Sequence, residues 1–135
     1  MRFAAIDIGS NAVRLLIANI IETEAGYSYK KDTLLRIPLR LGDDAFINNK
    51  LSEKKIKELS QTMSAFRNLL DVFKVSHYLA YATSAMREAE NGQEVIKRIK
   101  KEANIKIEII SGNVEAKMIY SSHIEQTLDQ KKNYV

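Results

Sequence analysis

Three short stretches of this chain gather the residue types that phosphate chemistry uses. The first, DIGSN at 7–11, sets an acid, a glycine, a hydroxyl and an amide side by side in an otherwise apolar region. If the N–H groups of Gly9, Ser10 and Asn11 point into one concave space, they suit phosphate oxygens. A carboxylate repels bare phosphate, so Asp7 is useful there only toward Mg²⁺ or an attacking water. A tight turn with an exposed aspartate explains the same residues without a ligand.

The second stretch, ATSAMREAEN at 82–91, follows a short apolar run that is typical of a buried strand. Thr83 and Ser84 offer hydroxyls where that strand ends, and Arg87 stands one helical turn further on. A guanidinium binds phosphate through two parallel hydrogen bonds, so Arg87 is a candidate phosphate ligand. The structural alternative is that Ser84 caps a helix and Arg87 pairs with a neighbouring glutamate on the surface.

The third stretch, IISGNVEAKMIY at 109–120, reads as a strand, a turn and the start of a helix. Ser111 and Gly112 form the turn, and Glu115 falls in the first turn of the helix. The helix dipole there favours the ionised carboxylate, which makes Glu115 a candidate general base. Acidic residues are also common at helix starts for stability alone, so this stretch by itself does not identify a base.

Composition restricts the classes of protein that this chain can represent. Its 135 residues are enough for one domain with a sizeable core. The 21 basic residues exceed the 17 acidic ones by a mild, scattered +4, so we expect no DNA or RNA partner. There is no cysteine, which excludes disulfides and thiolate chemistry. No apolar run approaches the roughly 18 residues of a membrane span, so we expect no membrane contact and a cytoplasmic protein.

The first third of the chain predicts three strands in an antiparallel meander. Strands are expected over 3–8 and 12–21, joined by a GSN link in which Gly9 supplies backbone freedom and Asn11 tolerates left-handed geometry. A third strand is expected over 27–41, with Pro38 at its end or on a sheet edge.

The rest of the chain predicts helices alternating with strands. We expect a loop over 42–50, and then a long amphipathic helix with Ser52 at its N-cap. The further expected elements are a strand over 77–83, a helix over 91–102, a strand over 105–110 and a helix after 111–113. The order β-β-β-α-β-α-β-α indicates an α/β fold with a mixed five-stranded sheet flanked by helices.

Taken together and in this order, the three stretches resemble the Ppx/GppA phosphatases, which are exopolyphosphatases and guanosine pentaphosphate phosphohydrolases. The segment LRLGDDAFINNKLSEKKI at 39–56 is also similar to the family's linking segment, so the resemblance spans essentially the whole chain. It implies a ribonuclease-H-like domain of the actin-like ATPase superfamily, which agrees with the order of elements derived above.

The resemblance also implies roles for the candidate residues. The reaction would be Mg²⁺-assisted hydrolysis of a terminal phosphoanhydride of polyphosphate or guanosine pentaphosphate, with water as the nucleophile. Such chemistry needs positioning and charge neutralisation and no covalent nucleophile. The implied site residues are Asp7 toward the metal, Gly9, Ser10, Asn11 and Arg87 toward phosphate, and Glu115 toward the attacking water.

The chain departs from the family pattern in two ways. The family's SG-x-EEA stretch reads SGNVEA here, so Val114 replaces the first of two glutamates. The family also continues beyond KKNYV into a glycine-rich second phosphate loop and a second lobe. We therefore expect 1–135 to be a single N-terminal domain that stops before that loop and is inactive by itself. The full-length protein is expected to be a homodimer, as relatives often are.

Two other functions stay open on the sequence alone. The first is a regulatory relative that binds polyphosphate or an alarmone without hydrolysing it, and Val114 is its main support. The second is another ATPase or a sugar kinase of the same superfamily, which DIGSN alone would permit. The second and third stretches argue against the kinase.

Overall fold

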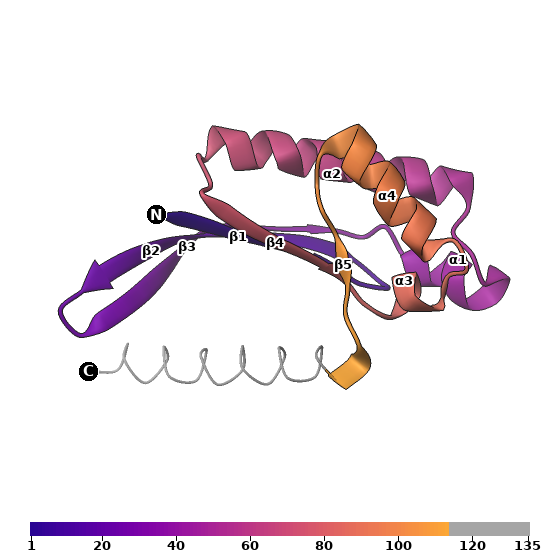
Figure 1. Ribbon diagram of the computed structural model, residues 1–135, viewed down its shortest axis with the longest axis horizontal. Helices are drawn as coiled ribbons and strands as arrows, with labels where there is room; N and C mark the ends of the chain where they lie inside the picture. Colours follow the sequence, from indigo (N-terminus) through magenta and orange to yellow (C-terminus); the bar gives the residue numbers. More distant parts are fainter. Residues whose placement is uncertain (114–135) are drawn as a thin grey trace.

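The computed structural model describes residues 1–113, in which helices pack on a mixed β-sheet (Figure 1). The chain order is a three-stranded meander, two helices, a strand, two further helices and a last short strand. The elements are β1 (Arg2–Ile8), β2 (Val13–Thr23), β3 (Gly26–Ile37), α1 (Leu41–Asn48), α2 (Glu53–Val72), β4 (His77–Ala82), α3 (Ser84–Glu88), α4 (Gly92–Ala103) and β5 (Glu108–Ile109).

The sheet has the strand order β3-β2-β1-β4-β5. β2 pairs antiparallel with both β1 and β3, whereas β4 pairs parallel with both β1 and β5. Parallel neighbours need a crossover connection, and α1 and α2 supply it between β3 and β4. The expected mixed five-stranded sheet is therefore confirmed, with the meander on one side of β1 and the crossover strands on the other.

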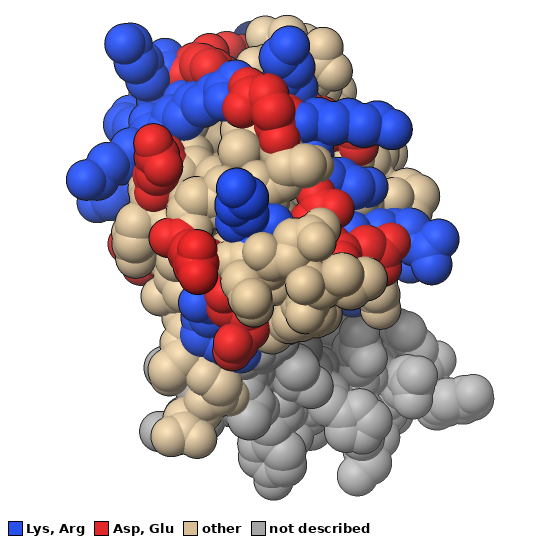
Figure 2. All heavy atoms as spheres, turned by 90° about the vertical axis from the view of Figure 1, so that its right-hand side faces the viewer, with Lys and Arg blue, Asp and Glu red and all other residues tan. Residues whose placement is uncertain are grey.

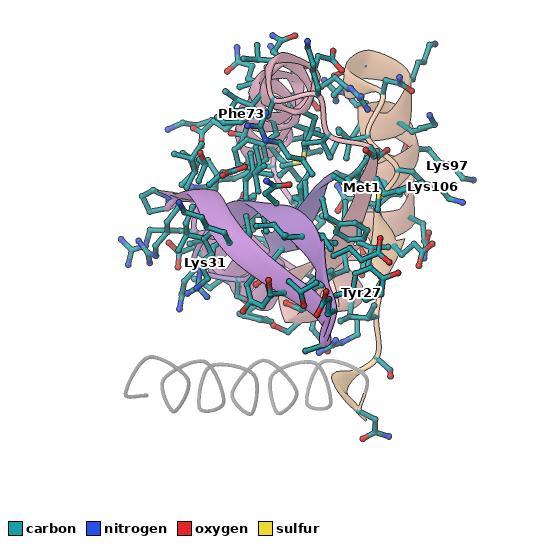
Figure 3. All side chains as sticks on the ribbon, turned by 90° about the vertical axis from the view of Figure 1, so that its left-hand side faces the viewer. Met1, Tyr27, Lys31, Phe73, Lys97 and Lys106 are labelled. Atoms are coloured by element: carbon teal, nitrogen blue, oxygen red, sulfur yellow. The ribbon has the colours of Figure 1, made fainter. Side chains whose placement is uncertain are left out.

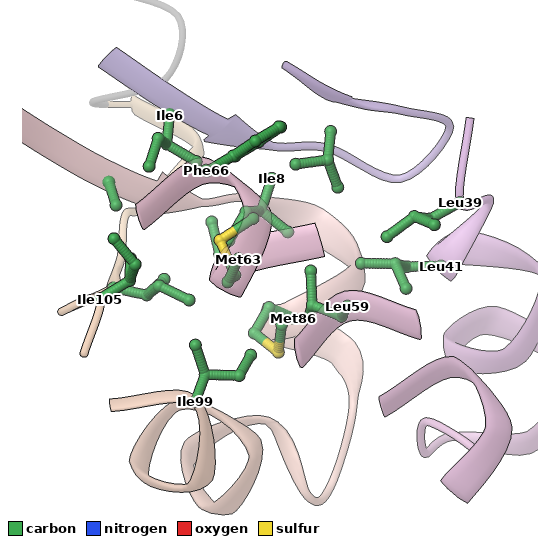
Figure 4. Packing of buried hydrophobic residues seen from close by; sticks show 14 of the residues in the cluster. Ile6, Ile8, Leu39, Leu41, Leu59, Met63, Phe66, Met86, Ile99 and Ile105 are labelled. Atoms are coloured by element: carbon green, nitrogen blue, oxygen red, sulfur yellow. The ribbon is translucent and has the colours of Figure 1, made fainter. Parts of the chain in front are cut away.

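One face of the sheet forms the core. Along β1, Ala4, Ile6 and Ile8 are buried while the residues between them are only half-buried, which is the alternation that a strand dictates. α2 and α4 run across this face (Figure 1). Figure 4 shows Ile6 and Ile8 of the sheet packed against Phe66 and Met63 of α2. Removing a side chain of this size from such a core costs about 2–5 kcal/mol.

The long helix α2 forms as the spacing of apolar residues predicts. Ser52 is its N-cap, and the serine Oγ accepts a hydrogen bond from the Lys55 amide at 3.3 Å. The buried positions recur every three or four residues and make one stripe. They are Ile56, Leu59, Ser60, Met63, Phe66 and Leu70.

The expected loop over 42–50 is wrong, because α1 occupies Leu41–Asn48. Leu41 and Ala45 lie one turn apart and are both fully buried, and Asp43 and Asp44 favour the first turn of a helix. A helix of two turns is too short for apolar periodicity to reveal it. The short helix α3 is absent from the expected order of elements, although the alternative in which Ser84 caps a helix allowed for one.

The meander agrees with its prediction in outline and differs in extent. β3 is an edge strand that ends at Ile37, so Pro38 lies just beyond an edge, as expected. β5 is limited to Glu108–Ile109, whereas the alternation predicted a strand over 105–110. The helix expected after 111–113 lies outside the described residues.

The far end of the meander extends beyond the rest of the sheet. Arg2 pairs with Asn19, and past that point β2 and β3 continue as a two-stranded ribbon (Figures 1 and 3). Tyr27 near its tip is 75% exposed. No helix within residues 1–113 is both long and apolar enough to cross a membrane.

Candidate functional site

The two phosphate-type stretches meet at one end of the sheet. β1 and β4 are parallel neighbours whose register ends at Ile8 opposite Ala82, so their carboxyl ends coincide. From there the chain turns from β1 to β2 on one side, and it continues from β4 toward β5 on the other. Ligands of open α/β sheets bind at such a reversal of strand order. The turn over 9–12 and the start of α3 both lie at this point.

Three backbone hydrogen bonds fix the turn over 9–12. The Gly9 amide donates to the Ala12 carbonyl at 3.0 Å and closes the turn. The start of α1 holds the turn from outside, because the Gly42 amide donates to the Ser10 carbonyl at 2.9 Å and the Arg40 amide to the Asn11 carbonyl at 3.0 Å. The backbone of the turn is therefore positioned before any ligand arrives.

This geometry corrects two details of the expected phosphate loop. The Gly9 amide is engaged within the turn, whereas the Ser10 and Asn11 amides donate to no other backbone carbonyl within residues 1–113. Neither Gly9 nor Asn11 has a positive φ, so the expected left-handed geometry is wrong. Glycine is suited to position 9 for lack of space, since a Cβ there would lie 3.0 Å from the Ala12 oxygen.

A contact between two serines joins the first stretch to the second. The Oγ atoms of Ser10 and Ser84 lie 2.6 Å apart and share a hydrogen bond. α3 is capped at Thr83, which is buried, and Ser84 is the first helical residue. The alternative that Ser84 is the N-cap of α3 is therefore wrong, and its hydroxyl faces the β1–β2 turn instead. The sequence offered Ser84 as a hydroxyl at a strand end but gave no sign of its partner.

Arg87 joins the second stretch to the third. It lies three residues after Ser84 on α3, so both side chains leave the same side of the helix. Its Nη1 donates to the Ile110 carbonyl at 2.6 Å, and the Ile110 amide donates to the Ala82 carbonyl at 3.0 Å. The chain just before the SGN turn at 111–113 is thereby held beside the end of β4.

Asp7 lies on the sheet face away from α2 and α4, one residue before β1 ends. Its side chain is half-buried, and its register neighbours are Arg14 on β2 and Tyr81 on β4. No group of three or more His, Cys, Asp or Glu residues within 1–113 could hold a metal ion. Mg²⁺ often binds through one or two carboxylates and otherwise through water and substrate phosphates. The donor set here fits that mode and does not fit an all-protein metal cage.

Two glycines that the sequence did not mark set the positions of the helices around the site. A Cβ at Gly42 would lie 3.1 Å from the Ser10 Cβ, so α1 can approach the turn only with glycine there. A Cβ at Gly92 would lie 2.3 Å from the Met86 carbonyl oxygen, so α4 begins in direct contact with the backbone of α3. Both glycines act by permitting close approach, since neither has a positive φ.

A charged hydrogen-bond pair joins the two helices that precede β4. Asp44 on α1 accepts from the Ser52 amide at 3.0 Å and from the Ser52 hydroxyl at 2.5 Å. These bonds stabilise the carboxylate and hold the pKa of Asp44 below its ordinary value, with the hydroxyl bond as the larger cause. The N-cap of α2 is therefore tied to α1, which in turn supports the phosphate-type turn.

Charge at this end of the molecule is mixed. Figure 2 views the face that lies on the right in Figure 1, and basic and acidic side chains alternate across it. A broad basic surface of the kind that nucleic acids require is absent from this view. Glu115 and Val114 lie outside the described residues, so the place of the expected base stays a prediction.

Comparison with protein families gives one match, which covers most of the chain. The model of the Ppx/GppA phosphatase family matches residues 33–135. Among curated relatives, exopolyphosphatase 1 of Mycobacterium bovis is 27% identical over 120 residues, which are 89% of this chain and 34% of the relative. A bifunctional 3-dehydroquinate synthase/phosphatase of Fusobacterium nucleatum is 34% identical over 84% of this chain and 18% of its own length.

Solved structures of similar sequence share the fold. The Ppx/GppA family member of Aquifex aeolicus superposes with a TM-score of 0.77 and is 35% identical, over 83% of this chain and 35% of its own. An exopolyphosphatase of Cytophaga hutchinsonii superposes with a TM-score of 0.79 and 33% identity, over 87% of this chain and 36% of its own. The chain thus spans about a third of the length of most of these relatives.

Proposed function

This chain belongs to the Ppx/GppA phosphatase family, and from that premise we propose that the full-length protein is a phosphoanhydride hydrolase. Its substrate is the terminal phosphoryl group of inorganic polyphosphate, with guanosine pentaphosphate as a second substrate of the same chemistry. We further propose that residues 1–135 form the N-terminal domain of this enzyme, which works as a homodimer. The names of the mycobacterial and Cytophaga relatives support the choice of polyphosphate.

One observation carries the proposal. The Ser10 and Ser84 hydroxyls touch at 2.6 Å although 74 residues separate them, so two phosphate-type stretches converge on one point. That point lies at the carboxyl ends of two adjacent parallel strands, where sheets of this kind bind ligands. Arg87 leaves α3 on the same side as Ser84, about one helical turn further along.

Each residue has a distinct part in the proposed reaction. The Ser10 and Asn11 amides donate to oxygens of the terminal phosphoryl group, which fixes its orientation. The hydroxyl that accepts within the Ser10–Ser84 pair adds its own O–H as a further donor. Arg87 stabilises the negative charge that these oxygens carry in the transition state. Glu115 accepts a proton from the attacking water, whose oxygen then bonds to phosphorus as the bond to the bridging oxygen breaks.

Asp7 would hold the metal ion of this reaction. Its carboxylate is the acidic group at the end of β1, and it is half-buried rather than fully exposed. When bound, Mg²⁺ supplies positive charge that neutralises the phosphate oxygens and template geometry for in-line attack. Asp7 would anchor the ion through its carboxylate, with water and substrate phosphates as the other ligands.

The experiment is phosphate release by the full-length protein with Mg²⁺, from polyphosphate and from guanosine pentaphosphate, for the wild type and for Glu115→Gln. Glutamine keeps the size of the side chain and removes the base, so we expect kcat to fall by about 10²-fold or more. Thermal unfolding of both proteins controls for damage to the fold. Equal rates would place the base elsewhere. Binding of polyphosphate without release by the wild type would favour the regulatory relative, whose main support is Val114.

A further inference from the structure

A hollow with two arginines lies directly beside the β1–β2 turn. It has a volume of about 430 Å³ and is lined by Asn11, Arg36, Pro38 and Arg40. Asn11 belongs both to this hollow and to the turn that carries Ser10, so the hollow adjoins the turn of the proposed phosphoryl site. None of its lining residues is acidic.

Positive charge gathers beside this hollow. Arg36 on β3 lies in register with Arg14 on β2, and directly opposite residues of antiparallel strands project from the same face. Like charges in such a pair destabilise a sheet. Arg14 has Asp7 of β1 on its other side, whereas Arg36 lies on the edge strand. Arg40 is the second cation of the hollow, and its acidic neighbour Asp43 lies 3.7 Å away, with both side chains more than 60% exposed. An anion in the hollow would supply Arg36 and Arg40 with the negative charge that Asp7 places beside Arg14.

The backbone of Arg40 is held in a conformation that few residues adopt. Its φ of 57° and ψ of 48° are left-handed, at the N-cap of α1. That geometry is unfavourable for an arginine because the Cβ crowds the following carbonyl. Two hydrogen bonds impose it, from the Arg40 amide to the Asn11 carbonyl at 3.0 Å and from the Asp43 amide to the Arg40 carbonyl at 3.2 Å. The side chain of this residue lines the hollow.

We propose that this hollow is a second anion subsite, which holds internal phosphates of a linear polyphosphate while the terminal group lies at Ser10 and Ser84. The inference rests on the proposed function and adds the path of the chain beyond the reacting end. Guanidinium groups bind phosphate oxygens through paired hydrogen bonds, and two of them beside one another suit successive phosphates. A hollow lined by four residues suits one narrow anionic chain better than a broad polyanion.

The subsite predicts a dependence on chain length. A long polyphosphate extends from the phosphoryl site to both arginines. The three phosphates of tripolyphosphate are bound largely at the phosphoryl site and reach the arginines little. The variants are Arg36→Gln, Arg40→Gln and their combination in the full-length protein. The control is Lys31→Gln, which removes the same charge from β3 about 16 Å further along the strand, where Figure 3 labels Lys31. Arg36→Gln changes an exposed side chain and keeps the test valid if Arg40→Gln unfolds.

We measure KM with Mg²⁺ for long-chain polyphosphate and for tripolyphosphate. Each arginine variant should raise KM for the long chain by about tenfold, the size of one lost charge-assisted hydrogen bond, and for tripolyphosphate much less. The long-chain effect should shrink as salt rises, because exposed charges are screened. Lys31→Gln should behave as the wild type with both substrates.

Two results would overturn the subsite. One is an equal rise in KM for both substrates, which would assign the arginines to the terminal phosphoryl group or to the fold. The other is a KM for long-chain polyphosphate that is the same in the arginine variants as in Lys31→Gln. If the wild type releases no phosphate at all, the proposed function fails separately. The affinity of the wild type and of the double variant for long-chain polyphosphate, measured by calorimetry, then tests the subsite independently of turnover. Weaker binding by the double variant would support the subsite, and equal binding would overturn it.

Discussion

Gly92 offers the sharpest link between packing and the site, and Gly92→Ala is the change that tests it. The added Cβ would lie 2.3 Å from the Met86 carbonyl oxygen and 3.3 Å from its carbonyl carbon. Met86 is on α3 between Ser84 and Arg87, and its carbonyl cannot rotate away as a side chain could. α3 must therefore move from α4 by at least about 0.7 Å to reach the closest contact that real Cβ atoms make.

The magnitude follows from two opposing effects. Overpacking of this kind costs about 1–3 kcal/mol, while alanine gains up to about 1 kcal/mol over glycine as a helix former. We expect a net loss of about 1–2 kcal/mol in the free energy of unfolding. The displacement also carries Ser84 and Arg87 away from the turn, and a misplacement near 1 Å can cost about 10²-fold in rate. The rate should therefore suffer more than stability does.

The assay pairs urea unfolding, followed by circular dichroism, with phosphate release by the full-length protein. Gln93→Ala is the matched control, because it is the exposed neighbouring residue in α4 and gains helix propensity without a clash. We expect Gln93→Ala to retain wild-type stability and rate. If Gly92→Ala matches Gln93→Ala in both measurements, then α3 is not positioned by this contact and the reasoning is refuted.

Three further predictions concern hydrogen bonds around the site. Ser84→Ala removes the hydrogen bond between the two hydroxyls, so it should cost about 1 kcal/mol in unfolding free energy and should lower kcat. Both are measured by urea unfolding and phosphate release, and an unchanged kcat would show that Ser84 is not part of the phosphoryl site. The Asn91 side chain accepts from the Leu51 amide at 2.9 Å and donates to the Leu51 carbonyl at 3.0 Å. Asn91→Ala leaves both groups without this partner and should cost about 2–3 kcal/mol of unfolding free energy in urea. A loss smaller than that of Ser84→Ala would contradict this expectation. Asp44→Asn removes a carboxylate whose pKa is lowered by Ser52, so the wild type should be the more stable protein above the ordinary value of 3.8, by about 1 kcal/mol or less. That advantage should vanish as pH falls through the folded pKa, and an advantage that persists at low pH would refute the assignment.

The sequence predicted those elements whose patterns are long enough to be unambiguous. α2 has five turns of regular apolar spacing and a serine N-cap, and β1 to β3 alternate or carry turn residues between them. α1 was expected to be a loop, and α3 was absent from the expected order of elements, because helices of eight and five residues repeat their buried face too few times. Their burial against the turn and the sheet, rather than any local propensity, stabilises them.

The candidate site was also only partly predictable from the sequence. The types of Asp7, Ser10 and Arg87 indicated phosphate chemistry from sequence alone, and their placement at the ends of β1 and β4 fits that chemistry. The contact between Ser10 and Ser84 could not be predicted, because it joins residues 74 positions apart through the register of two strands. The pairing of Arg36 with Arg14 likewise depends on register, which a single strand pattern does not reveal.

The most direct test of the central claim is polyphosphate hydrolysis by the full-length protein in water enriched in heavy oxygen, with Mg²⁺ and without nucleotide. Mass spectrometry of the released orthophosphate then identifies the attacking group. The account predicts that each released phosphate carries one solvent oxygen, because water attacks the terminal phosphorus and the bridging oxygen stays with the shortened chain. If phosphate leaves polyphosphate only when a nucleotide or sugar acceptor is added, and orthophosphate gains no solvent oxygen, the protein is a transferase and the account is contradicted.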